Sequence, residues 1–121
     1  MNVLTVARVV GVICVGALAV LSLIPGADVP RTGAPHAVEH FIAYAITALV
    51  LGLAYRDLKV RLNLGLALIL FAGLMEIAQF WALSRGPNVS DWLAGAIGVG
   101  AGFLAAATIN HFILNKSLQE G

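Results

Sequence analysis

The sequence predicts an all-α membrane protein, a four-transmembrane-helix bundle, on the evidence of its composition and of four long apolar segments. The chain has 121 residues, of which 60% are hydrophobic and only 11% are charged, whereas a soluble domain carries roughly 25% charged residues. A soluble domain of this size keeps much of its surface in water and cannot hide so much apolar side chain. The four segments follow one another with short connections, so we expect one domain over residues 1–121.

The first two predicted spans cover residues 3–24 and 35–55. Each is close to the roughly 20 apolar residues that a transmembrane helix needs. Pro25 and Gly26 end the first span, and Pro35 suits the first turn of the second, where its missing N–H is not needed. No small-x-small cleavage site follows the first span, so we expect a retained helix and not a signal peptide.

The last two predicted spans cover residues 62–83 and 91–114. Gly86 and Pro87 close the third span, and Ser90 is the predicted N-cap of the fourth. Strands are not expected, because the edge of an open sheet would leave unpaired backbone groups in lipid.

The distribution of Lys and Arg predicts that both termini lie in the cytoplasm. With four spans, the two termini share one side of the membrane with the loop between the second and third spans. Basic residues concentrate on the cytoplasmic side of membrane proteins. Five of the seven basic residues lie on the side of the termini: Arg8, Arg56, Lys59, Arg61 and Lys116.

Polar residues gather at the opposite, extracytoplasmic end of the predicted helices. His40 and Tyr44 are four positions apart and therefore share a helix face. Glu76 lies roughly 10 Å below the outer end of its helix, at 1.5 Å per residue. A carboxylate at that depth is costly to expose to lipid, so it should point into the bundle. We therefore expect a binding site formed by His40, Tyr44, Glu76, Gln79, Arg85 and Asp91.

Two other interpretations of these polar residues stay open. Polar side chains between membrane helices often serve only to hold the helices together. His36, His40, Glu76 and Asp91 are also metal-ligand types that could converge. However, the two histidines lack the His-Glu-x-x-His order of a common zinc site, and no cysteine contributes. The sequence therefore favours a site without a metal or other cofactor.

The fourth predicted span carries a row of small residues at a spacing of three and four. Gly95, Gly98 and Gly102 would let a second helix approach closely. We expect this face to pack within the chain, and the alternatives are homodimerisation and docking of another membrane subunit.

Several short runs carry a resemblance to a known family. They are Leu21–Gly26, His40–Tyr44, Glu76–Gln79, Arg85, Asp91 and Gly98. In this order they resemble the VanZ-like family of small bacterial membrane proteins. Its founding member is associated with low-level resistance to teicoplanin, a glycopeptide that targets lipid-linked peptidoglycan precursors. The resemblance implies a multi-pass protein of the bacterial cytoplasmic (inner) membrane that acts in the cell envelope.

We expect the polar site to bind an anionic lipid or a lipid-linked envelope precursor. Arg85 and protonated His40 would hold a phosphate, since Arg offers two parallel donors to such a group. A small accessory subunit of a larger membrane complex is the alternative. A third hypothesis is an enzyme that uses Glu76 for acid–base chemistry. However, no nucleophile is evident and no catalytic residue is assigned. The net charge of +1 and the lack of a basic run argue against a nucleic-acid partner.

Overall fold

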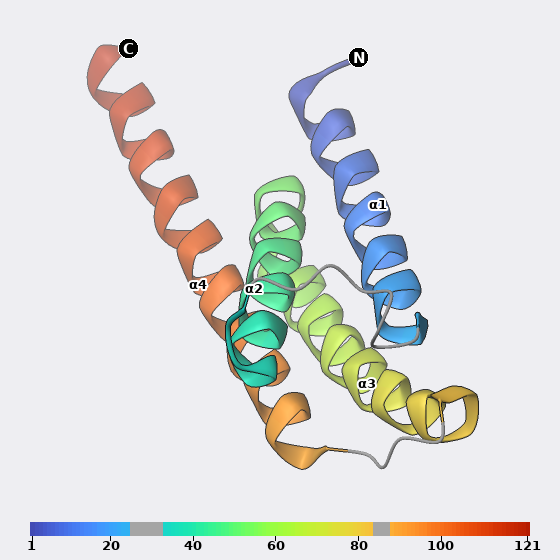
Figure 1. Cartoon of the computed structure of the whole chain (residues 1–121). Helices are drawn as coiled ribbons and strands as arrows, with labels where there is room; N and C mark the ends of the chain where they lie inside the picture. Colours follow the sequence, from blue (N-terminus) through green and yellow to red (C-terminus); the bar gives the residue numbers. More distant parts are fainter. Residues whose placement is uncertain (25–32, 84–87) are drawn as a thin grey trace.

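The computed structural model describes residues 1–24, 33–83 and 88–121, without the side chains of residues 82 and 83. This part of the chain contains four α-helices and no strands. All four helices are long and apolar enough to cross a membrane, which confirms the predicted fold class. In chain order they are α1 (Val3–Leu23), α2 (His36–Ala54), α3 (Leu58–Leu83) and α4 (Val89–Glu120) (Figure 1).

Helix α3 begins at Leu58 and not at the predicted residue 62. The side chain of Asp57 accepts a hydrogen bond from the backbone N–H of Val60 at 3.1 Å, which satisfies one of the free donors at the start of the helix. The apolar segment therefore marks the part of α3 suited to lipid, whereas the helix itself begins in the polar loop before it.

Helix α4 is longer than predicted at both ends, running from Val89 to Glu120 where residues 91–114 were expected. Its N-cap is Asn88 and not the predicted Ser90, because the Asn88 side chain accepts the N–H of Ser90 at 3.0 Å. No proline or glycine interrupts the chain between residues 103 and 120, so the helix continues through its polar end.

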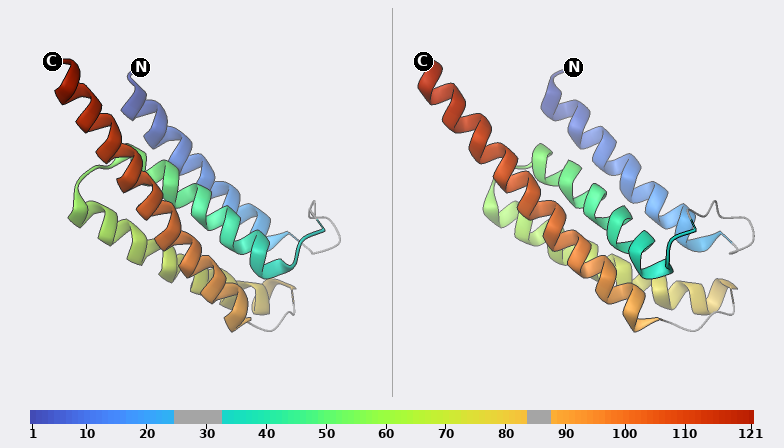
Figure 2. Two further views of the ribbon diagram at one scale, coloured as in Figure 1. Left: turned by 90° about the vertical axis from the view of Figure 1, so that its left-hand side faces the viewer. Right: turned by 60° about the vertical axis from the view of Figure 1, so that its left-hand side comes forward.

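Helix α2 lies at the centre of the bundle and contacts α1, α3 and α4. Its pairing with α4 is the most extensive, and the two views of Figure 2 show these helices running side by side. Helix α1 lies on the other side of α2 and contacts α2 and α3.

Three glycines of α4 form the surface on which α2 packs. A Cβ atom added at Gly98 or Gly102 would run into backbone atoms of α2, including carbonyl oxygens. One added at Gly95 would lie 3.2 Å from the ring of Tyr44. The predicted packing of this face within the chain is confirmed, and all three glycines are buried.

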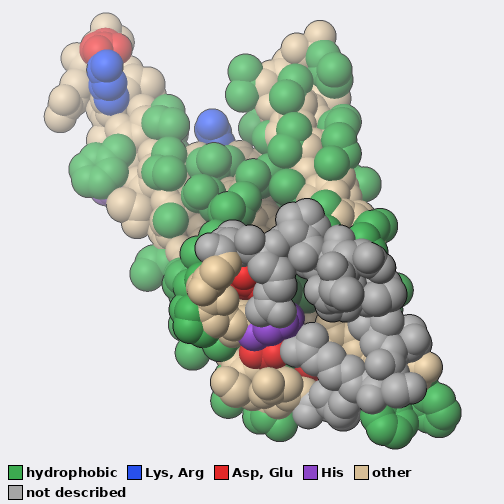
Figure 3. Space-filling model, in the orientation of Figure 1, with side chains coloured by type: hydrophobic (Ala, Val, Ile, Leu, Met, Phe, Trp, Pro, Cys, Tyr) green, Lys and Arg blue, Asp and Glu red, His purple; other side chains and the backbone are tan. Residues whose placement is uncertain are grey.

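Large apolar side chains cover the outside of the bundle, as Figure 3 shows for one face. Val12 is 70% exposed, Leu70 is 59% exposed and Leu104 is 70% exposed. Water-soluble proteins seldom expose so much contiguous apolar surface, and lipid is its natural solvent. The buried interior between the helices consists of Leu18, Tyr44, Ala48, Leu51, Leu68, Ala72 and Val99.

Both termini lie at the same end of the bundle, together with the α2–α3 connection (Figure 1). Arg61 there donates to the backbone oxygens of Gly52 at 2.7 Å and Tyr55 at 2.8 Å. These carbonyls belong to the last turn of α2, which has no further helical donors for them. The guanidinium of Arg8 lies 5.0 Å from the centre of the Tyr55 ring.

Candidate functional site

Histidine and carboxylate side chains from α2, α3 and α4 meet at the end of the bundle opposite the termini. His36 and His40 lie in the first turns of α2, and Asp91 lies in the first turn of α4. Glu76 comes two turns before the end of α3. Antiparallel helices bring their starts and ends to the same level, which is why residues far apart in sequence meet here. Figure 3 shows imidazole and carboxylate atoms next to each other on the surface at this end.

Glu76 connects the three helices. Its Oε1 atom lies 3.4 Å from Nε2 of His40 in α2. Its Oε2 atom accepts the backbone N–H of Asn88, the N-cap residue of α4, at 3.1 Å. The Glu76 side chain is only 6% exposed, so the protein has replaced most of the water around this carboxylate with its own groups.

The ring of His40 has a defined proton position on one nitrogen. Nδ1 lies 3.0 Å from the backbone oxygen of His36, one helical turn earlier. A carbonyl oxygen only accepts hydrogen bonds, so Nδ1 must carry a proton. The other nitrogen, Nε2, faces Glu76, either as a second N–H in the imidazolium or as a lone pair in the neutral ring.

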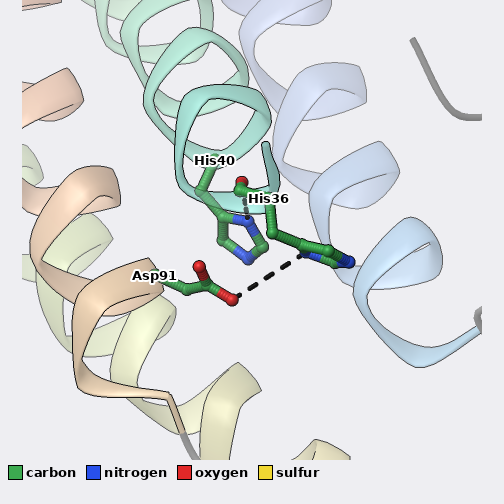
Figure 4. A group of neighbouring side chains, drawn as sticks. All are labelled: His36, His40 and Asp91. Carbon is green, nitrogen blue, oxygen red and sulfur yellow. Dashed lines mark hydrogen bonds and ion pairs between the residues drawn. The ribbon is translucent and has the colours of Figure 1, made fainter. Parts of the chain in front are cut away.

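Asp91 and His36 form the outer part of the site (Figure 4). Nδ1 of His36 lies 3.8 Å from Oδ2 of Asp91, and the rings of His36 and His40 have centres 5.7 Å apart. The Asp91 side chain is 3% exposed and that of His36 is 33% exposed. A buried carboxylate is therefore covered by an imidazole that solvent or a ligand can reach.

Tyr44 and Gln79 lie beside this cluster and face other elements. The Tyr44 ring packs on Gly95 within the bundle interior. The Gln79 amide donates to the backbone oxygen of Ser22 in α1 at 2.9 Å. Gln79 therefore joins α3 to α1, and its buried Oε1 has no hydrogen-bond partner among the described residues.

A hollow of about 130 Å³ lies between α3 and α4, next to Glu76. Trp92 forms one wall and is held in place by a hydrogen bond from its Nε1 to the Ile69 backbone oxygen at 3.0 Å. The hollow can receive a small apolar group beside the carboxylate. Its lining residues are Gly73, Glu76, Ile77, Asn88, Val89 and Trp92.

The predicted site residues thus fall into three groups. His40, Glu76 and Asp91 belong to the histidine–carboxylate cluster, while Tyr44 and Gln79 flank it. Arg85 lies outside the described residues. The predicted site omitted His36 and Asn88. His36 was detectable from its spacing, four positions before His40, whereas Asn88 acts through its backbone N–H and was not detectable from residue type.

This arrangement can bind cations through carboxylate oxygen and imidazole nitrogen atoms. Fold and site together define a four-helix membrane protein with a buried histidine–carboxylate cluster at one end. Comparisons with family models, with curated proteins and with solved structures found no match. The VanZ-like resemblance therefore stays a prediction from the sequence motifs.

Proposed function

We propose that this chain is a VanZ-like protein of the bacterial cell envelope, one that binds the headgroup of an anionic lipid or lipid-linked precursor at the outer leaflet of the inner membrane. The His40–Glu76–Asn88 network is the observation that carries the proposal. It is a polar site built from three helices, set in a bundle whose outside is apolar. Polar groups in such a place are commonly functional, because leaving them in lipid is expensive.

The position of the network at the end of the bundle fits a lipid headgroup. The cluster lies at the end of the bundle, where an apolar outer surface gives way to the first turns of α2 and α4. His36 is partly accessible above buried Asp91, so a headgroup can reach the cluster from that side. From the sequence alone, Arg85 adds a cation that would pair with a phosphate.

Lipid retention by the purified protein tests the proposal. Wild type and variants are extracted in mild detergent, and the co-purified lipids are compared with the bulk membrane by mass spectrometry. We expect wild type to be enriched in anionic lipid and both His40→Ala and Arg85→Ala to lose that enrichment. His111→Ala is the matched control, since His111 is an exposed histidine of α4 outside the site. The same lipid composition in all four proteins would refute headgroup binding at this site.

An accessory subunit of a larger membrane complex is a second candidate, and the length of α4 favours it. Helix α4 has 32 residues, about 48 Å at 1.5 Å per residue, whereas the hydrocarbon core is about 30 Å thick. Residues 111–120 are all exposed and include Phe112 and Leu118. Native electrophoresis in mild detergent tests this candidate, and a band at the mass of one or two chains would count against it.

A further inference from the structure

We propose that His36, His40 and Asp91 form a binding site for a divalent transition-metal ion of the zinc type. Each residue presents one ligand atom, and these atoms all lie within 4.8 Å of one another. Figure 4 shows the two imidazoles and the carboxylate converging from α2 and α4. Imidazole nitrogen and carboxylate oxygen are the ligands that zinc accepts in proteins.

The separations are close to those of a coordinated ion. Zinc lies about 2.0–2.2 Å from nitrogen and oxygen ligands in a tetrahedral arrangement, which places the ligand atoms about 3.4 Å apart. Nδ1 of His36 and Oδ2 of Asp91 are 3.8 Å apart. All three ligand atoms lie within 4.8 Å of one another, so rotations of the side chains that shorten these separations by about 1 Å would bring the atoms onto one ion.

The surroundings of His40 are those of a metal-binding histidine. Such a histidine usually donates its second N–H to a carbonyl or a carboxylate, which fixes the orientation of the ring. Nδ1 of His40 makes this bond to the His36 backbone oxygen at 3.0 Å. Nε2 is then the ligand atom, and the second carboxylate beside it is Glu76, at 3.4 Å.

The sequence around the two histidines supports zinc over calcium or magnesium, which prefer sites made of oxygen atoms alone. His36, Glu39 and His40 follow the order His-x-x-Glu-His, which occurs on the zinc-binding helix of one class of metallopeptidase. Positions i, i+3 and i+4 of a helix share one face. Asp91 would complete three protein ligands and leave a fourth position open to water or to a ligand.

This inference deepens the proposed function, because an ion with an open position would bind a headgroup phosphate directly. Only the binding of a headgroup phosphate by the ion rests on the proposed function. The metal site itself depends on the side chains of His36, His40 and Asp91, and it can be tested without any lipid.

Zinc titration of the full chain in detergent tests the proposal. The protein is prepared without a polyhistidine tag, stripped with a chelator and titrated calorimetrically with Zn²⁺. We expect about one ion per chain for wild type and for the His111→Ala control. Loss of a second-shell group already weakens metal sites about 10–100-fold, so His36→Ala and Asp91→Asn should each weaken binding by more than about 100-fold. Visible absorption of the Co²⁺-loaded wild type should show the intense bands of a tetrahedral site.

Two results would overturn the metal site. One is wild type that binds no Zn²⁺ and shows no Co²⁺ spectrum. The other is equal binding by wild type, His36→Ala and Asp91→Asn. Circular dichroism checks that each variant remains helical, and Asp91→Asn preserves the shape of the side chain. Lipid retention is measured separately, with and without chelator. If the protein retains anionic lipid but binds no zinc, the metal site is refuted and the proposed function stands. If it binds zinc but retains no anionic lipid, headgroup binding is refuted and the metal site stands.

Discussion

The carboxylate of Glu76 in α3 and the imidazole of His40 in α2 lie against each other, with Oε1 and Nε2 3.4 Å apart. The same carboxylate accepts the N–H of Asn88 at the start of α4. One buried side chain therefore connects three helices at the end of the bundle where α2 and α4 begin.

Removing the Glu76 carboxylate should destabilise the protein. Glu76→Ala leaves the Asn88 N–H without its acceptor and removes the carboxylate beside His40, and an unsatisfied buried polar group costs about 1–3 kcal/mol. Glu76→Gln retains an oxygen that can accept the Asn88 N–H, so this variant should lose less stability than Glu76→Ala. Thermal unfolding in detergent measures both, with the exposed Glu120→Ala as control. Equal midpoints for Glu76→Ala and Glu120→Ala would contradict a structural role for Glu76.

The glycine face of α4 should tolerate no added methyl group. A Cβ at Gly98 meets the backbone of Phe41 in α2, and overpacking of this kind typically costs about 1–3 kcal/mol. Gly100 lies two residues further along the same helix, where a Cβ would meet nothing within 4 Å. We expect Gly98→Ala to lower the unfolding midpoint and Gly100→Ala to leave it unchanged or slightly raised. If the two variants unfold alike, the close α2–α4 packing is not present in solution.

Arg61 should stabilise the end of α2 through the shape of its guanidinium and not through charge alone. Its Nε and Nη2 atoms donate to two backbone oxygens of the last turn. Lysine keeps the charge but cannot reproduce this two-pronged contact. We expect Arg61→Lys to lose about 1 kcal/mol of stability, since one of two charge-assisted bonds is lost. Exposed Arg56 provides the matched control. An equal loss in Arg56→Lys, or no loss in Arg61→Lys, would show that the two-pronged contact of Arg61 does not stabilise the end of α2.

The positive-inside argument gives a direct prediction of topology. In a chain that carries Cys14→Ser, a cysteine placed at exposed Val89 should react with an impermeant thiol reagent added to spheroplasts. A cysteine at exposed Lys59 should react only after the membrane is permeabilised. Both positions lie on the surface of the fold. The opposite labelling pattern would place the histidine–carboxylate cluster on the cytoplasmic side. The site could then not bind a headgroup of the outer leaflet.

Most of the fold can be predicted from the sequence, because lipid demands long apolar helices and these are visible in composition alone. Helix ends are less predictable. Asp57 and Asn88 begin α3 and α4 through local hydrogen bonds of polar loop residues, and hydropathy does not report such bonds. The extension of α4 to Glu120 likewise lies outside the apolar segment.

The site was predictable in part, and helix geometry explains why. Three residues along a helix fall about 60° short of a full turn, so Glu76 and Gln79 can face different neighbours. Glu76 faces α2 and the start of α4, whereas Gln79 bonds to Ser22 of α1. Spacing alone places both residues on one broad side of α3 and does not tell which neighbouring helix each one meets.

A structure determined in native lipid would test the central claim most directly, namely that the histidine–carboxylate cluster receives a lipid headgroup. We predict density for a headgroup in contact with His40, Glu76 or Asp91. A well-resolved site that contains only protein side chains and water, in protein that retains its native lipid, would contradict the account.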